Sequence, residues 1–544
     1  MKRILALILV LIMAFSLSAC GNGEVSSGAP PADGSESTAP AAGGADDEPA
    51  SGGMIDRLNI GTFDNNRGAL LSNGQDSTAG SAQSLVFDML IYIDPETGEP
   101  KSNILDFEIV NDGTSLSMTL KDGITFSNGA AATGEDLLYT FQSQVQGHAR
   151  GMATVPTTYD PASARLLDDG MTVVVESAGG LHASHMFGEL MLCEFLNKEW
   201  CESDENVWAG EIWYHGPVGS GPYRVKEYVT NQSYLLEYRD DWWQAGERTV
   251  PAKEIKITYY NDASTMYMDL ENGAIDLAIN IASADFARAQ EDKSGKIVSK
   301  RIIDNNIWQL FMDVDNSPLS NQDLRLAIAH AVDWNAVALA GQEDLWSPAT
   351  SFIASTMLYY KNVGQYEYDV ELAKQYLAKA GCEPGELTLN MTVTMGPMDS
   401  MAVVIQYYLG QVGIGLNIKS VDPGSYIDAL MSGDGDFQFM SMPQATPDGD
   451  PISMFKAPVM MPFLNVRRLS DEKWAELFED FVMAKTDDEI ASAAGALQQH
   501  IFDTASAIAI CEINSAVAWN PEVIADPHLS YTPGANLNFI ELAQ

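Results

Sequence analysis

From Leu58 onward the hydrophobic residues follow two periods, one typical of strands and one typical of helices. Runs that alternate between apolar and polar positions, such as 233–238 and 253–260, predict strands. Apolar residues three and four positions apart predict helices, as in 323–332. The two kinds of segment alternate with short links between them. This order predicts α/β domains.

Turn and cap residues place several element boundaries. Asp-Gly pairs at 122–123 and 169–170 each separate two strand-like runs, so each predicts a β-hairpin. Thr133, with Asp136 three residues later, predicts the start of a helix. In the segment 369–381 a capping Asp opens a helical pattern and a Gly closes it, which predicts one complete helix.

The N-terminus has the order of an export signal. Positive charge at 2–3 is followed by an almost wholly apolar run over 4–17 and by small residues before Cys20. The apolar run is shorter than the roughly 20 residues that span a bilayer, so we expect a signal peptide over 1–19. The stretch before the cysteine resembles a bacterial lipobox, which implies that Cys20 is lipidated. The alternative is an ordinary signal peptide with an incidental cysteine.

The composition of the next segment indicates that this segment does not fold. Residues 21–53 are nearly all Gly, Ala, Ser, Pro and acids, without any aromatic side chain. Such a segment cannot bury enough apolar surface to fold. We therefore expect a disordered tether over 20–53, with a mean reach of about 30 Å. The roughly 490 residues that follow are enough for two or three domains.

Charge and cysteine content restrict the partners. Seventy-five acids against 30 bases give a formal net charge of -45. Nucleic acids and anionic lipid surfaces need a basic face, so neither is expected as a partner. Cys193 and Cys201 lie eight residues apart and can form a disulfide in an oxidising compartment, or they can be buried thiols.

Five segments carry a resemblance to a known family. They are "LKDGITFSNGAAATGEDLLYTF" (120–141), "GPVGSGPYRVKEY" (216–228), "YLLEYRDDWW" (234–243), "SPLSNQDLRLAIAHAVDWNAV" (317–337) and "YEYDVELAKQYLAKAG" (366–381). In this order and at this spacing they resemble the large extracytoplasmic solute-binding proteins of the oligopeptide, dipeptide and nickel class (family 5).

The resemblance implies a fold and a domain plan. The fold is α/β, the two-lobed periplasmic-binding-protein-like fold (type II, cluster C), with an extra domain on lobe I. Ligand would bind between the lobes, which close over it. The implied boundaries are 54–86, 212–302 and 512–544 for lobe I, 87–211 for the extra domain and 303–511 for lobe II.

The resemblance also implies a function. The chain would be the binding component of an ABC importer, a monomer anchored by lipid at the outer face of the cytoplasmic membrane. It would deliver a peptide to the permease subunits. Two alternatives stay open: another solute (a cationic small molecule, a sugar or a metal chelate), or an exported enzyme such as a hydrolase. No H-E-x-x-H, G-x-S-x-G or phosphate-cradling Gly-Lys motif supports an enzyme. No cofactor is expected.

Three segments should face the cleft by resemblance. They are the crossover strand at 306–318, the loop at 439–455 and the segment at 464–474. In the loop, an Asp would pair with the α-ammonium of a peptide. The ligand-binding candidates are Trp308, Gln309, Phe311, Asp448 (with Asp450 in reserve), Asn465 and Arg467.

Two further patterns bear on the ligand. The segment 392–401, where dipeptide-binding members place an Arg for the ligand carboxylate, contains no Arg or Lys. A dipeptide specialist is therefore disfavoured. His182, His185, Glu189 and Cys193 would share one face if their segment were a helix, and these residue types suit zinc or nickel. The alternative is the half-buried face of an ordinary helix, and we predict no metal site.

Overall fold

The computed structural model describes most of the chain after the predicted tether. The described residues are 54–63, 79–94, 97, 99–149, 158–191, 193–203, 216–229, 232–246, 248, 250–314, 318–432, 434–443, 449–452, 454–455, 471–529 and 540–543. The predicted signal peptide (1–19), lipidated Cys20 and tether (20–53) lie outside them. Within the described ranges, no helix combines the length and the apolar character needed to cross a bilayer.

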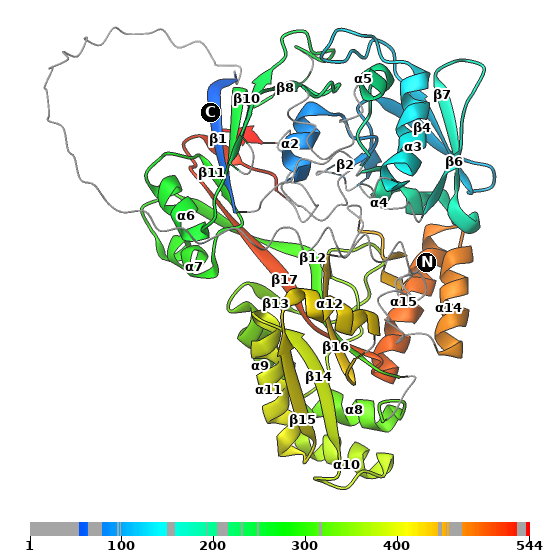
Figure 1. Ribbon diagram of the computed structural model, residues 1–544, viewed down its shortest axis with the longest axis vertical. Coiled ribbons are helices and arrows are strands. Elements are labelled where there is room, and N and C mark those ends of the chain that lie inside the picture. Colours follow the sequence, from blue (N-terminus) through cyan, green and yellow to red (C-terminus); the bar gives the residue numbers. More distant parts are fainter. Residues whose placement is uncertain are drawn as a thin grey trace, which may run out of the picture. The chain divides into compact units, whose positions relative to one another are not determined.

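One large mixed sheet runs through the described body (Figure 1). The pairs β1–β10, β1–β11, β14–β15 and β14–β16 are parallel. In spatial order the strands are β15 (Gly415–Val421), β14 (Thr388–Thr394), β16 (Phe437–Pro443), β12 (Val298–Met312), β17 (Ala507–Trp519), β11 (Leu277–Ile279), β1 (Ile55–Thr62), β10 (Ala252–Tyr259), β9 (Ser233–Tyr238) and β8 (Tyr223–Val229), and β13 (Trp346–Pro348) pairs with β17.

Two long antiparallel strands, β12 and β17, join the two parts of this sheet, and both run through the middle of Figure 1. We call the part around β1 and β8–β11 the first lobe and the part around β14–β16 the second lobe. The pairing of β12 with β17 shifts register between Ile303 and Ile307. Such an irregularity bends a strand locally. The connection between the lobes therefore contains a built-in bend.

A separate four-stranded sheet forms what we call the small-sheet domain. Its order is β4 (Leu105–Val110), β5 (Ser115–Leu120), β7 (Thr172–Ser177) and β6 (Tyr159–Leu166). The hairpin predicted at 169–170 is confirmed, because β6 and β7 pair across it. The hairpin predicted at 122–123 is wrong. Strand β5 pairs with β4 on one edge and with β7 on the other. The residues after the turn at 122–123 therefore have no free edge of β5 with which to form a hairpin.

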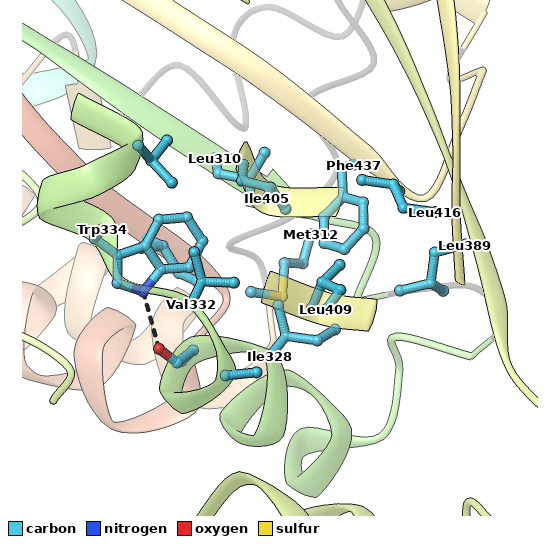
Figure 2. Close-up of a cluster of buried hydrophobic side chains, with 14 of the residues drawn as sticks. Leu310, Met312, Ile328, Val332, Trp334, Leu389, Ile405, Leu409, Leu416 and Phe437 are labelled. Carbon is cyan, nitrogen blue, oxygen red and sulfur yellow. Dashed lines mark hydrogen bonds between the residues drawn. The ribbon is translucent and has the colours of Figure 1, made fainter. Parts of the chain in front are cut away.

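The helices of the second lobe cover a core that they share with the sheet (Figure 2). Leu310 and Met312 from β12 meet Ile405 and Leu409 of α11 in this core. The indole of Trp334 donates a hydrogen bond to the carbonyl of Ala329, at 2.9 Å. The helices that contribute to this core are α8 (Gln322–Ala331), α9 (Trp334–Gln342), α10 (Val370–Ala380) and α11 (Pro397–Gln411). The second lobe also contains α12 (Pro423–Ser432), and α14 (Glu472–Met483) and α15 (Asp487–Thr504) share a second hydrophobic cluster.

The remaining described elements are short or lie outside the second lobe. The helices are α2 (Ala79–Val86), α3 (Gly134–Ala149), α4 (Phe187–Leu190), α5 (Lys198–Ser203), α6 (Ala263–Glu271) and α7 (Ser283–Glu291), with 3-10 turns η2 (Ala178–Gly180) and η3 (Ala183–Met186). The strands are β2 (Tyr92–Ile93), β3 (Pro100–Lys101), β18 (Ile524–Asp526) and β19 (Glu541–Leu542).

The predicted helix boundaries are confirmed by their caps. At the start of α3 the backbone N–H of Thr133 donates to the Asp136 carboxylate at 2.9 Å, and the Asp136 N–H donates to Thr133 Oγ1 at 3.3 Å. These two bonds satisfy N–H groups that the helix itself leaves without a partner. At α10 the Asp369 side chain caps the start, and Gly381 ends the helix with φ 74°.

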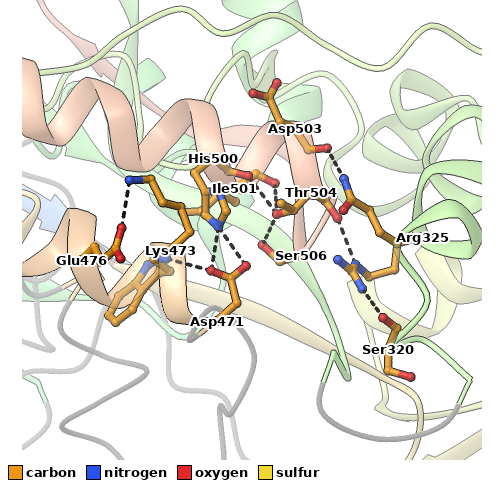
Figure 3. A network of polar contacts seen from close by, with 12 residues as sticks. Ser320, Arg325, Asp471, Lys473, Glu476, His500, Ile501, Asp503, Thr504 and Ser506 are labelled. Carbon is orange, nitrogen blue, oxygen red and sulfur yellow. Dashed lines mark hydrogen bonds and ion pairs between the residues drawn. The ribbon is translucent and has the colours of Figure 1, made fainter.

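A polar network holds α14 and α15 to α8 (Figure 3). Arg325 of α8 is buried, and its guanidinium donates to the carbonyl of Thr504 at 2.9 Å and to that of Leu319 at 2.8 Å. Between the other two helices, His500 contacts the carboxylate of Asp471 at 2.9 Å. These contacts fix the C-terminal end of α15 just before β17 begins.

Two of the family-like segments contact each other in the first lobe. The buried guanidinium of Arg239 donates to the carbonyls of Gly219, at 3.2 Å, and Gly221, at 2.9 Å. The indole of Trp242 donates to the carbonyl of Ser220 at 3.1 Å. These hydrogen bonds therefore join the segment 234–243 to the segment 216–228 and stabilise the first lobe.

Candidate functional site

The crossover strand and the predicted cleft loop are neighbours in the sheet. Strand β12 pairs with β16, and Gln309 lies opposite Met440 while Phe311 lies opposite Gln438. Strand β16 leads directly into the loop that carries the predicted acids. The structure therefore brings two of the three predicted cleft segments together at the junction of the lobes.

The three candidates on β12 do not share one face, because side chains alternate along a strand. Trp308 packs into the core of the second lobe, beside Leu310. Phe311 points the other way and meets the ring of Phe352 edge-on, with centroids 5.9 Å apart. The amide of Gln309 donates to the carbonyl of Phe352. Gln309 and Phe311 therefore both contact Phe352.

Of the other candidates, the structure describes Asp450 alone. Asp448, Asn465 and Arg467 lie outside the described residues. Asp450 is buried, and its Oδ2 lies 2.5 Å from Nδ1 of His185. Its Oδ1 accepts a hydrogen bond from the Ile452 N–H at 2.8 Å. The role of all these residues as ligand contacts stays a prediction.

His185 comes from the small-sheet domain, so the contact with Asp450 joins two parts of the protein. The His185 side chain is 0% exposed and that of Asp450 is 4% exposed. Removing one member of such a buried hydrogen-bonded pair costs about 1–3 kcal/mol, because the other loses this contact inside the protein. The pair is therefore a strong link between the small-sheet domain and the second lobe.

A series of aromatic rings leads from the His185–Asp450 pair to the crossover strand β12. The His185 ring lies 5.3 Å from that of Phe481, which in turn lies 5.3 Å from Phe455. Phe455 stacks on Phe352 at 6.3 Å, and Phe352 reaches Phe311 on the crossover strand. An unbroken series of ring contacts thus joins His185 to β12.

The four residues considered for a metal site take separate partners. His182 Nδ1 lies 2.8 Å from Ser184 Oγ, and Glu189 accepts a hydrogen bond from the Thr158 hydroxyl at 2.6 Å. Cys193 Sγ lies 3.4 Å from the hydroxyl of Tyr159. Among the described residues, no group of three or more His, Cys, Asp or Glu side chains is arranged to hold a metal ion.

Cys193 and Cys201 are buried thiols. Cys193 and Cys201 do not form a disulfide with each other. Burial raises the pKa of Cys193 to about 12 and also raises that of Cys201. Both thiols are therefore protonated at neutral pH. Since the thiolate is the reactive and metal-binding form, neither thiol suits nucleophilic catalysis or metal binding.

A cavity of about 260 Å³ lies within the second lobe, apart from the predicted contacts. Trp334, Tyr366, Gln498 and Phe502 are among its lining residues, and Trp308, Gln309, Phe311 and Asp450 are not. Its volume is below the range of about 300–1,000 Å³ typical of small-molecule sites.

Comparison with known families identifies the chain. Residues 99–456 match the model described as "Bacterial extracellular solute-binding proteins, family 5 Middle". The chain belongs to this family. The resemblance seen in the sequence is thereby confirmed. Members of the family bind solutes and are not enzymes, so the exported hydrolase considered from the sequence is set aside.

Curated relatives of the chain carry several ligand names. Heme-binding protein A of Haemophilus influenzae is 24% identical over 58% of this chain and 60% of its own length. The dipeptide-binding protein of Escherichia coli is 27% identical over 48% of each chain. With these relatives the chain aligns over less than two thirds of their length. Oligopeptide-binding protein OppA of Bacillus subtilis is 23% identical over 84% of each chain.

Solved structures show the same fold. HbpA2 from Haemophilus parasuis superposes with a TM-score of 0.77 at 18% identity, covering 90% of this chain and 100% of that one. DppA from Helicobacter pylori, in complex with peptide STSA, gives 0.70 at 18% identity, covering 90% and 99%. The predicted two-lobed α/β fold is confirmed. The exact lobe boundaries stay a prediction.

Proposed function

We propose that this protein is the lipid-anchored binding component of an ABC importer and that it captures a peptide between its two lobes. Membership of the family 5 solute-binding proteins carries this proposal. Two antiparallel strands with a bend between the lobes are a suitable hinge for closure over a ligand. The proposed boundaries are those expected from the sequence, with lobe I at 54–86, 212–302 and 512–544, the extra domain at 87–211 and lobe II at 303–511.

A peptide is favoured over the other solutes by the extent of the alignments. OppA of Bacillus subtilis aligns over 84% of its own length and a probable di/tripeptide-binding protein of Pseudomonas aeruginosa over 82%, whereas the haem-binding relative aligns over 60% of its length. The segment 392–401, which ends β14 and begins α11, supplies no Arg or Lys for a ligand carboxylate. We therefore expect a peptide of about four or more residues, held mainly through its backbone.

Export and anchoring follow from the N-terminal sequence. The apolar run, the small residues and Cys20 have the order of a lipoprotein signal. We propose that the mature protein begins at Cys20 and stays at the outer face of the cytoplasmic membrane. The tether over 20–53 would let the monomeric body reach its permease.

Thermal unfolding with solute pools tests the proposal. A ligand that binds only the folded state stabilises it by RT ln(1 + [L]/Kd), which is about 2.7 kcal/mol at 100 times Kd. We expect at least one pool of peptides of four or more residues to raise the melting temperature, and no dipeptide pool to do so strongly. Mass spectrometry of the solute that co-purifies with the protein gives its chemical identity.

Haem, sugars and nickel chelates are measured in the same way. If only one of these raises the melting temperature, the peptide proposal is wrong, while the role as a solute-binding protein stands. If a bound compound is chemically converted, the binding role itself is contradicted.

A further inference from the structure

We propose that the segment 181–186 of the small-sheet domain is a clasp that holds the second lobe against this domain. Its central contact is the pair formed by His185 and Asp450, whose nitrogen and oxygen lie 2.5 Å apart. Both side chains are buried, so the contact lies inside the protein and not at an exposed rim.

The segment is firmly rooted in its own domain. The N–H of Ala183 donates to the carbonyl of Gly113 at 2.7 Å, and the hydroxyl of Ser177 donates to the carbonyl of Leu181 at 2.6 Å. Ala183 and Met186 are buried in the hydrophobic core of the small-sheet domain. These contacts leave the positions of Leu181 and His185 fixed by the domain from which they come.

Leu181 and His185 nevertheless also contact the second lobe. Leu181 is 2% exposed and belongs to the hydrophobic cluster that contains Phe352, Phe481 and other side chains of that lobe. The His185 ring lies 5.3 Å from that of Phe481 on α14. The apolar Leu181 and the polar His185, four residues apart, thus both contact the hydrophobic cluster that contains Phe481.

Charged groups lie beside the clasp at the start of α15. His182, half-buried on the same segment, is close enough to Asp487 and Lys485 for their charges to act on it, and burial lowers its pKa. The segment therefore contacts the second lobe through Leu181 and His185, while His182 lies within reach of the charges near the start of α15.

The contacts of the clasp named above join groups of the chain itself. We therefore expect the clasp to form without a solute and to hold the Asp450 end of the predicted cleft loop in place. The clasp concerns the same junction as the proposed function, but it can be tested without any solute. A failure of the peptide proposal and a failure of the clasp are thus distinguishable.

Hydrogen–deuterium exchange of the dialysed, solute-free protein tests the clasp. In His185→Gln and Asp450→Asn we expect exchange to rise by roughly tenfold or more in both 181–190 and α14 (Glu472–Met483), because both lose the shared contact. Exchange in β4–β7 should stay unchanged. The double variant should show little more than either single variant, since the two residues act as a pair.

Two further variants serve as controls. His185→Asn keeps a donor near the place of Nδ1 and should restore most of the protection. His528→Gln removes a histidine from an exposed pair with Glu541, 3.4 Å apart, and should change neither segment.

A rise in only one of the two segments, or in neither, would show that the pair does not hold the two parts together. A uniform rise over the whole protein would show that the pair belongs to the folding core, and this result too overturns the clasp. If His185→Gln does not fold, the milder Phe481→Leu change in the same contact is judged by the same criteria.

Discussion

Gly219 lies directly against the carbonyl oxygen of Val86, so close that a Cβ on Gly219 would overlap this oxygen. The same is true of Gly221, where a Cβ would come within 2.6 Å of the carbonyl oxygen of Leu85. The N–H of Gly221 donates to the carbonyl of Val86 at 2.9 Å. Gly219 and Gly221 of the family-like segment 216–228 are therefore required by backbone packing.

Gly219→Ala should destabilise the protein by about 1–3 kcal/mol or more, since backbone atoms cannot move away as a flexible side chain can. The matched control is Gly410→Ala in α11, where an added Cβ meets nothing within 4 Å. That change should be neutral or stabilise by about 0.5–1 kcal/mol, as expected for Gly to Ala in a helix. Chemical denaturation of both variants measures the difference. Equal stability of the two would contradict the close packing of Gly219.

A buried carboxylate on β17 predicts a pH dependence of stability. Glu512 is 3% exposed, and its carboxylate accepts hydrogen bonds from the N–H of Ser355 at 2.5 Å and from its hydroxyl at 2.9 Å. Burial raises the pKa of Glu512, and these two bonds oppose the rise only in part. The folded state therefore binds the proton of Glu512 more tightly than the unfolded state does.

The sign of the effect follows from linkage. The stability that protonated Glu512 contributes is fully present below the unfolded pKa of about 4.3 and is lost as pH rises through the higher folded pKa. Glu512→Gln removes this titration. Its melting temperature relative to the unmodified protein should therefore increase between about pH 4 and pH 7. Glu522→Gln, the same change at an exposed position, serves as the control. A constant difference across this pH range would contradict the prediction.

The sequence predicts local structure best where one short motif decides it. The Thr133–Asp136 cap and the Asp369–Gly381 helix depend on residues within one or two turns of each other, so they are readable from the chain. The hairpin at 122–123 fails because the partners of β5 are chosen by tertiary packing with β7, which lies more than fifty residues later.

The contact between His185 and Asp450 could not be predicted in this way, because 265 residues separate the pair. The spacing of His182, His185, Glu189 and Cys193 suggested a shared face only under the assumption of one continuous helix. The structure has instead a 3-10 turn, Ala183–Met186, and a single α-helical turn, Phe187–Leu190. In this geometry the four side chains take separate partners.

Removal of the predicted lipid attachment site should release the protein from the membrane. Cys20→Ala deletes the thiol that would carry the lipid, so we expect the variant in the medium or periplasm with its folding intact. Cys382→Ala, which removes a cysteine outside the lipobox, should stay with the membrane fraction. Fractionation and immunoblotting measure both. Retention of Cys20→Ala at the membrane would contradict the lipid anchor.

The last prediction concerns charge at the predicted cleft loop. Asp450 is already paired with His185, so Asp448 is the acid of this loop that we expect to meet a ligand cation. A hydrogen bond between charged groups contributes about 1.5–3 kcal/mol. Asp448→Asn should keep the shape of the side chain. It should lower the affinity for a peptide with a free α-amine by roughly ten- to a hundredfold.

Chemical blocking of the ligand separates a direct contact from a general effect of the acidic surface. The N-acetylated form of the same peptide should bind the unmodified protein more weakly by a similar factor, and should lose little more with Asp448→Asn. This non-additivity is expected only if the carboxylate and the amine form a pair. Isothermal titration calorimetry of the four combinations measures it. Because a general field effect would be felt by both forms of the peptide, equal losses on mutation for the free and the acetylated peptide would mean that Asp448 does not contact the amine.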